Sequence, residues 1–96
     1  MEMKIIIRAF ATIREVLGTG HTEILLEDGS DVRILLKALT KKFGDAFRNQ
    51  ILASEENLAP YVKVLVNGRD IDYLNGMGTK LKDGDEVAII PPVAGG

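Results

Sequence analysis

The residues of this chain that are best suited to chemistry are the last six of its sequence, Pro91-Pro92-Val93-Ala94-Gly95-Gly96. None of their side chains can act as an acid, a base or a nucleophile, so the one reactive group expected here is the α-carboxylate of Gly96. Because glycine has no Cβ, a Gly95-Gly96 end can pass through a channel that is too narrow for other residues. Pro91 and Pro92 cannot donate ladder hydrogen bonds, so they are expected to end the preceding strand and to extend the chain. Six extended residues span about 20 Å, enough to carry the Gly96 carboxylate into the active site of another protein.

The rest of the chain offers few candidates for catalysis. It has no cysteine, which excludes disulfides, thiolate nucleophiles and thiolate zinc or iron–sulfur sites. Its single histidine, His21, precedes an expected strand, and no Gly-x-Ser-x-Gly motif lies nearby, so we interpret it as a surface residue. The sequence therefore predicts a domain without catalytic residues, metal ligands or a bound cofactor.

The composition is that of one ordinary folded domain of 96 residues, with 46% hydrophobic and 27% charged residues. A formal net charge of −2 gives no electrostatic footprint for nucleic acid or for an anionic membrane. No apolar run approaches the ~20 residues that a transmembrane helix needs, and the beginning of the sequence lacks the layout of a signal peptide. We therefore expect a cytoplasmic protein that binds neither nucleic acid nor membranes.

Two segments show helical signals. Residues 11–20 predict a short helical turn that Gly18 closes. In residues 32–43 the apolar side chains recur at helical spacing, which predicts the main helix, with Ser30 as its N-cap. Residues 45–60 are the least determined part. They allow a short second helix and then an exposed loop.

Alternating β-branched residues predict strands in the remaining segments. These strands are expected at residues 3–10, 22–27, 61–66 and 86–91, with a weaker extended piece at 69–73. The alternation gives each strand an inward apolar face. Four apolar side chains are left on the outward face: Ile6, Phe10, Leu65 and Ile90.

This order of elements predicts an α+β fold of the β-grasp type, with a mixed sheet of four to five strands and one main helix packed on one face. In this arrangement the last strand lies beside the first and parallel to it, with a right-handed crossover. We expect residues 1–90 to form the domain and residues 91–96 to form a flexible, protruding tail. The four outward apolar residues would then cluster on the helix-free face, next to the start of the tail. Such a patch is typical of an interface, and a homodimer contact or simple packing is the alternative.

Several motifs together resemble the ubiquitin-like sulfur carriers of the MoaD/ThiS type, in particular the small subunit of molybdopterin synthase and the archaeal small modifier proteins. The resemblance spans nearly the whole chain, and residues 44–60 are long enough to favour these two branches over the thiamine-pathway carriers. Asp70 departs from the pattern, because an apolar residue is expected there in the molybdopterin-type proteins. The motifs are Ala11-Thr12-Ile13-Arg14-Glu15-Val16-Leu17-Gly18, Val66-Asn67-Gly68, Leu81-Lys82-Asp83-Gly84-Asp85-Glu86-Val87 and the final Pro91-Pro92-Val93-Ala94-Gly95-Gly96.

The resemblance implies a mechanism in which this chain is a co-substrate rather than an enzyme. A ubiquitin-activating-type adenylating enzyme would bind the helix-free face and use ATP and Mg to adenylate Gly96. A persulfide on that enzyme or on a sulfurtransferase would then convert the terminus to a thiocarboxylate. The interface with the partner would include Phe10, Ile6, Leu65, Ile90, Pro91, Pro92 and Val93.

The resemblance leaves two fates open for the activated Gly96. The thiocarboxylate can donate sulfur to the precursor of the molybdenum or tungsten cofactor, in a complex with the large subunit of molybdopterin synthase. Alternatively, a lysine of a target protein attacks Gly96 and forms an isopeptide bond, and one protein can do both. A third reading is a non-covalent β-grasp interaction module, whose function would survive removal of Gly95 and Gly96.

Overall fold

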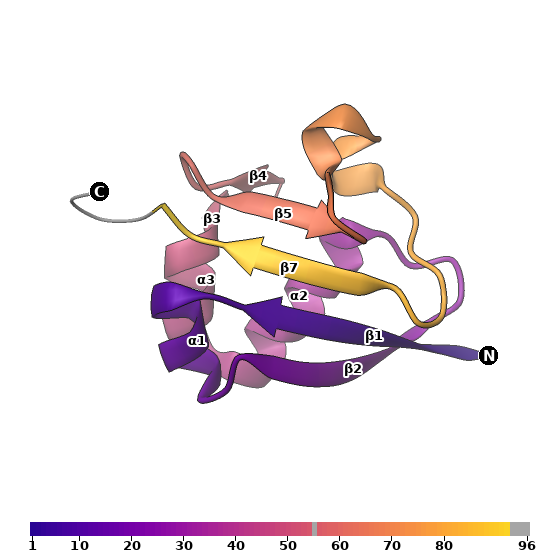
Figure 1. Cartoon of the computed structure of the whole chain (residues 1–96), viewed down its shortest axis with the longest axis horizontal. Helices are drawn as coiled ribbons and strands as arrows, with labels where there is room; N and C mark the ends of the chain where they lie inside the picture. Colours follow the sequence, from indigo (N-terminus) through magenta and orange to yellow (C-terminus); the bar gives the residue numbers. More distant parts are fainter. Residues whose placement is uncertain (55, 93–96) are drawn as a thin grey trace.

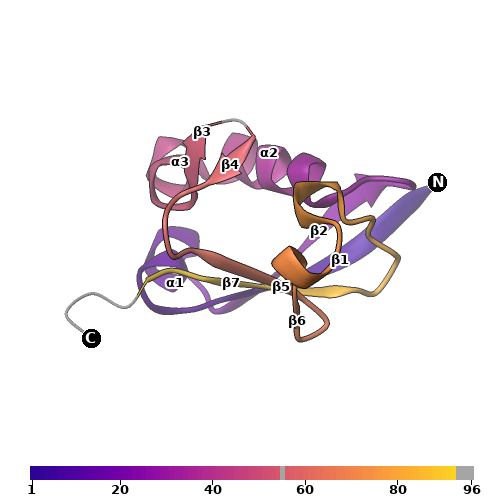
Figure 2. The ribbon, with the colours of Figure 1, turned by 90° about the horizontal axis from the view of Figure 1, so that it is seen from above.

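A mixed sheet of five strands forms the front layer of the molecule in Figure 1, and helices lie behind it. The computed structural model describes residues 1–54 and 56–92. In spatial order the strands of the sheet are β2 (His21–Glu27), β1 (Glu2–Ala9), β7 (Glu86–Ile90), β5 (Lys63–Val66) and β6 (Arg69–Asp70). Seen from above in Figure 2, helices α2 (Val32–Phe43) and α3 (Asp45–Ile51) cover one face of this sheet, and no helix of the described residues covers the other face.

The strand pairing has the expected topology. Strand β1 pairs antiparallel with β2 and parallel with β7, with Ile7 opposite Val87 in the parallel pair. Strand β5 also pairs with β7, antiparallel, with Val64 opposite Ile89. The last strand therefore lies beside the first and parallel to it, which confirms the β-grasp prediction.

The core lies between the sheet and α2. Alternate residues of β1, β5 and β7 point inward and are buried, as the alternation predicted, and one face of α2 packs against them. Fully enclosed apolar side chains of this kind each contribute about 1.5–3 kcal/mol relative to exposure. The most deeply buried large side chains are Phe47, Ile5, Ile7, Ile13, Leu35, Leu36, Leu39, Ile51, Ile71, Ile89, Val32 and Val64.

Helix α1 (Ala11–Leu17) confirms the predicted helical turn. Gly18 ends it in the left-handed conformation, with φ of 77°, which glycine adopts without steric cost. Ile13 and Leu17 are the buried residues of α1. No helix within residues 1–54 and 56–92 has the length and apolarity needed to cross a membrane.

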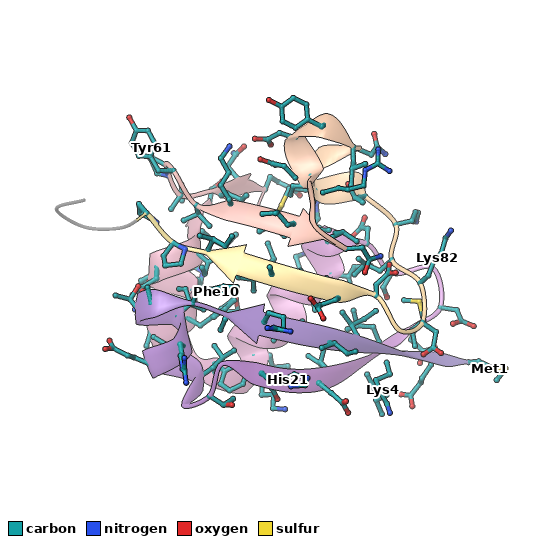
Figure 3. All side chains as sticks on the ribbon, in the orientation of Figure 1. Met1, Lys4, Phe10, His21, Tyr61 and Lys82 are labelled. Atoms are coloured by element: carbon teal, nitrogen blue, oxygen red, sulfur yellow. The ribbon has the colours of Figure 1, made fainter. Side chains whose placement is uncertain are left out.

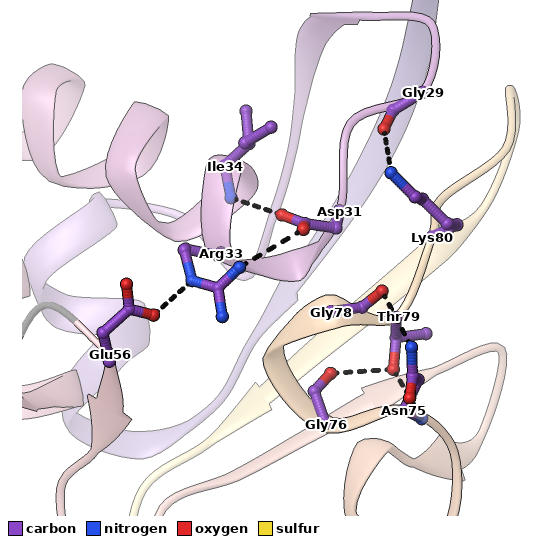
Figure 4. A network of polar contacts seen from close by, with 10 residues as sticks. All are labelled: Gly29, Asp31, Arg33, Ile34, Glu56, Asn75, Gly76, Gly78, Thr79 and Lys80. Carbon is purple, nitrogen blue, oxygen red and sulfur yellow. Dashed lines mark hydrogen bonds and ion pairs between the residues drawn. The ribbon is translucent and has the colours of Figure 1, made fainter.

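The N-cap of α2 is Asp31, so the prediction of Ser30 was wrong. The Asp31 carboxylate accepts a hydrogen bond from the backbone N–H of Ile34 at 3.0 Å (Figure 4). Ser30 is buried instead, and its carbonyl accepts a hydrogen bond from the backbone N–H of Leu81. Arg33 pairs with both Asp31 and Glu56 and so ties the first turn of α2 to the segment after α3.

The segment that the sequence left least determined is more ordered than predicted. Helix α3 follows α2 directly and buries Phe47 and Ile51, which confirms a short second helix. Its continuation is a hairpin of β3 (Leu52–Ser54) and β4 (Asn57–Leu58) rather than an unpaired loop.

The weaker extended piece at 69–73 is a strand only as far as Asp70. There the Asp70 carboxylate accepts a hydrogen bond from the backbone N–H of Asp72 at 2.9 Å, and the chain turns into the 3-10 helix η1 (Ile71–Tyr73). A second 3-10 helix, η2 (Gly76–Gly78), follows before the chain enters β7.

Candidate functional site

The strand that leads to the tail is the central strand of the sheet. Strand β7 is paired on both sides, and its last residue, Ile90, lies opposite Lys63 of β5. Pro91 is buried at the end of β7, and Pro92 is the first exposed residue beyond it. We call Ile90 to Pro92 the tail root. Because β7 is held from both sides, the tail root has a fixed position in the domain.

The remaining predicted tail residues, Val93, Gly95 and Gly96, lie outside the described residues. The activated terminus therefore stays a prediction from the sequence. The structure describes the surface from which the tail starts.

An apolar patch lies on the helix-free face beside the tail root. Its members are Phe10, Leu65, Ala88 and Ile90, and we call them the root patch. Leu65 lies directly opposite Ala88 on neighbouring strands, and both are half-buried, as is Ile90. Phe10 follows β1 by one residue, with 43% of its surface exposed, and lies next to the end of β7 (Figure 3). Three of the four outward apolar residues predicted for this face therefore lie near one another.

The fourth predicted residue, Ile6, lies earlier in β1 and further from the tail root. It is level with Glu86 rather than with Ile90. Arg8 stands between Ile6 and Phe10 in the strand, and its guanidinium pairs with the Glu86 carboxylate at 3.6 Å. An ion pair thus separates Ile6 from the root patch.

The place of Phe10 in the chain is unusual for an aromatic residue. It is the N-cap of α1, and its side chain makes no capping hydrogen bond. Serine, threonine, aspartate and asparagine are strongly preferred at this position, and an apolar residue there forgoes about 1 kcal/mol. A partly exposed phenylalanine at an N-cap therefore contributes little to local stability, which favours a role on the surface.

Two features beside the tail root were not predicted from the sequence. Tyr61 is 83% exposed and has a φ of 66°, which is rare and strained for a bulky side chain. Figure 3 shows Tyr61 and Phe10 on either side of the end of β7. The sequence predicts neither the φ angle nor the exposure of Tyr61, because both depend on how the chain enters β5.

The second unpredicted feature is an ionic cluster next to Ile90. Lys63 Nζ lies 3.3 Å from an oxygen of Asp72 and 3.4 Å from an oxygen of Asp70. The hydrogen bond to Asp72 and the charge of Asp70 raise the pKa of Lys63 above its ordinary value of 10.5. Asp70 lies opposite Leu65, so a charge limits the root patch at the position where an apolar residue was expected from the resemblance to the molybdopterin-type proteins.

The groups around the tail root form an apolar surface with charged borders. They are hydrocarbon side chains bordered by ion pairs, and in residues 1–54 and 56–92 no three histidine, aspartate or glutamate side chains are grouped as metal ligands. The site thus combines a fixed tail root with an apolar surface of a few residues, which suits a protein that presents its terminus to another protein.

Comparison with known proteins agrees with this arrangement. The profile of the ThiS family matches residues 7–96. The small archaeal modifier protein 3 of Haloferax volcanii is 39% identical over 94 residues, which cover 98% of this chain and 100% of that protein. The molybdopterin synthase sulfur carrier subunit of Chlamydomonas reinhardtii is 36% identical over 95 residues, with coverage of 98% and 100%.

Solved structures show the same fold. The Haloferax volcanii HVO 2177 protein superposes with a TM-score of 0.85 at 39% identity, covering 99% of this chain and 88% of that one. In the Amycolatopsis orientalis BexX/CysO complex, the matched chain has a TM-score of 0.72 at 28% identity, with coverage of 96% and 99%. The proteins matched here thus include a small archaeal modifier, the sulfur carrier subunit of a synthase and a chain of the BexX/CysO complex. The family match over residues 7–96, the two relatives aligned over nearly their whole length and the β-grasp topology together show that this chain belongs to the ThiS family of ubiquitin-like sulfur carriers and modifiers.

Proposed function

We propose that this chain is a sulfur carrier whose Gly96 carboxyl group is adenylated by a partner enzyme and then converted to a thiocarboxylate. The observation that carries the proposal is the family similarity, which extends from residue 7 to Gly96. The domain supplies the fixed tail root and the root patch. The nucleotide, its Mg and the catalytic residues belong to the partner.

The chemistry requires activation because a carboxylate is a poor acyl donor. An oxygen of the Gly96 carboxylate attacks the α-phosphate of ATP, and pyrophosphate leaves. The terminal sulfur of a persulfide then attacks the carbonyl carbon of the adenylate, and AMP leaves. A second thiol cleaves the sulfur–sulfur bond, which leaves the thiocarboxylate on Gly96 and a disulfide on the donor. The chain has no cysteine, so its terminus is the place where it can hold the sulfur.

The proposed acceptor is the precursor of the molybdenum or tungsten cofactor, bound by a large synthase subunit. Support comes from the relative in Chlamydomonas reinhardtii, a molybdopterin synthase sulfur carrier subunit that aligns over 98% of this chain. In this reading, the root patch contacts first the activating enzyme and then the large subunit.

A second function is favoured by a different relative. The Haloferax volcanii protein, which aligns over 98% of this chain, is a small archaeal modifier. As a modifier, the chain would form an isopeptide bond when a lysine Nζ of a target protein attacks the activated Gly96 carbonyl. Both functions share the adenylate, so they differ only in the nucleophile that follows.

The proposal is tested by measuring the intact mass of the chain recovered from its natural cells. Exchange of one oxygen for one sulfur, lost when Gly95 and Gly96 are deleted, supports sulfur carriage. Gly-Gly remnants on lysines of other proteins, found by tryptic mass spectrometry, support modification. A chain that lacks Gly95 and Gly96, folds normally and still restores the pathway would contradict both functions. The non-covalent interaction module would then be the remaining interpretation.

A further inference from the structure

A basic hollow borders the root patch at the end of β1. It has a volume of about 430 Å³ and is open to solvent. Neither aspartate nor glutamate is among its lining residues. These are Arg8, Ala9, Phe10, Arg14, Thr19, Gly20 and His21.

Arg14 is held in the hollow by local packing. It lies one helical turn after Phe10, and its backbone N–H donates to the Phe10 carbonyl. A Cβ on Gly20 would lie 3.3 Å from Arg14 Nε, so the glycine gives the guanidinium room to lie close to the backbone. Among the described residues no carboxylate lies within 4.0 Å of the Arg14 guanidinium, whereas Arg8 shares its charge with Glu86.

The position of the hollow beside Phe10 indicates which side chains of a partner it can receive. Phe10 belongs both to the hollow and to the root patch, so a protein that covers Phe10 comes to lie against the hollow that Arg14 lines. Removing a guanidinium from water without a partner charge is strongly unfavourable. Arginine pairs best with carboxylates, because its planar fork matches their two oxygens. A partner that binds here therefore has to supply acidic side chains.

We propose that this hollow receives an aspartate or glutamate side chain of the activating partner and so forms the ionic part of the docking surface, with Arg14 as its main contact. This inference rests on the proposed function, because it assumes that the partner covers Phe10. The occupant is not a phosphate of the nucleotide. Adenylation takes place at Gly96, and the four residues beyond the root can extend about 13 Å, whereas the hollow lies at the root itself.

The test compares charge reversal at two matched positions. Arg14→Glu changes an exposed arginine in the last turn of the seven-residue helix α1. Arg48→Glu makes the same change in the last turn of the seven-residue helix α3, which lies on the opposite face. Each variant is assayed for ATP–pyrophosphate exchange with the purified adenylating enzyme of the same organism, at increasing NaCl. Thermal melting checks that both variants are folded, and Arg14→Gln provides a neutral change.

We expect Arg14→Glu to lower kcat/KM by about tenfold or more, through KM, and to weaken its dependence on salt. Arg14→Gln should have a smaller effect in the same direction, and Arg48→Glu should match the wild type. Equal losses for Arg14→Glu and Arg48→Glu, or an unchanged salt dependence, would overturn the proposal.

A binding measurement separates this inference from the proposed function. Chains that lack Gly95 and Gly96 cannot be adenylated, but they keep the docking surface, so their affinity for the adenylating enzyme is measured by calorimetry with and without Arg14→Glu. Weaker binding of the Arg14→Glu chain supports the proposed role of the hollow in docking, even if the full chain proves inert toward ATP. Equal binding of the two truncated chains overturns the proposed role of the hollow in docking, even if the full chain is adenylated normally.

Discussion

Asn67 and Asp85 hold the turn after β5 against the start of β7. Asn67 Nδ2 donates a hydrogen bond to Asp85 Oδ1 at 2.9 Å, and Asn67 Oδ1 accepts one from the backbone N–H of Glu86 at 2.9 Å. The backbone N–H of Asn67 also donates to the Glu86 carbonyl at 2.7 Å. The Asn67 side chain thus fixes the register in which β7 enters the sheet. It thereby also fixes the position of the tail root, which lies at the other end of β7.

Replacing Asn67 should destabilise the domain in two separable ways. Asn67 has a φ of 51°, a conformation that asparagine tolerates and alanine does not. We expect Asn67→Ala to lower the free energy of unfolding by about 2–3 kcal/mol, through two lost hydrogen bonds and backbone strain. Asn67→Gly removes the same bonds without the strain, so its loss should be smaller. Urea denaturation measures both, and equal losses for the two variants would show that the left-handed conformation costs nothing here.

Phe10→Asp should abolish docking without unfolding the domain. The substitution removes the aromatic group from the root patch but places a favourable N-cap residue at the start of α1. We therefore expect a melting temperature equal to or slightly above that of the wild type, and a sharp fall in turnover by the activating enzyme. Phe47→Ala, in the fully buried core, is the contrasting variant and should cost about 3–5 kcal/mol. A strongly lowered melting temperature of Phe10→Asp would place Phe10 in the core instead.

Tyr61→Asn should stabilise the domain. Tyr61 is exposed with a positive φ, so the change relieves backbone strain and loses little packing. We expect a gain of about 0.5–1 kcal/mol in the free energy of unfolding. Tyr73 is equally exposed but is not among the residues with positive φ, so Tyr73→Asn should change stability by less than about 0.5 kcal/mol. The two variants are compared by urea denaturation, and equal effects would show that the strain at Tyr61 is negligible.

The cluster around Lys63 predicts a pH dependence at the alkaline end. The pKa of Lys63 is raised in the folded state by Asp72 and Asp70. Its ion pairs therefore stabilise the fold fully below 10.5, the ordinary pKa, and this stabilisation is lost as pH rises through the higher folded pKa. The difference in melting temperature between the wild type and Lys63→Met should be small, constant near neutral pH, and vanish at strongly alkaline pH. A difference that persists there would mean that Lys63 acts through packing of its hydrocarbon chain.

The sequence predicted the faces of the strands well, because alternation with a period of two depends on neighbouring residues alone. Ile5 and Ile7 were assigned to the core and Ile6 to the outside, and the structure agrees. The apolar residues of the root patch could be proposed for the same reason, since Phe10 and Ile90 fall on the outward side of predicted strands.

What the sequence did not predict depends on contacts between distant segments. Ser30 and Asp31 are both good N-caps, and the choice between them is made by the pairing of Asp31 with Lys80 and of Ser30 with Leu81. The separation of Ile6 from the root patch follows from the strand register, which sets Glu86 beside it. The basic hollow likewise needs Gly20 to lie under Arg14, which no local pattern reveals.

The central position of β7 also has a mechanical consequence. A pull on the tail acts along β7, whose hydrogen bonds to β1 and β5 run across the direction of the force. These bonds are therefore loaded together, in shear, rather than opened one after another as at the edge of a sheet. In the proposed modifier role, a force that pulls on the linked protein would therefore act on the strand that is paired on both sides.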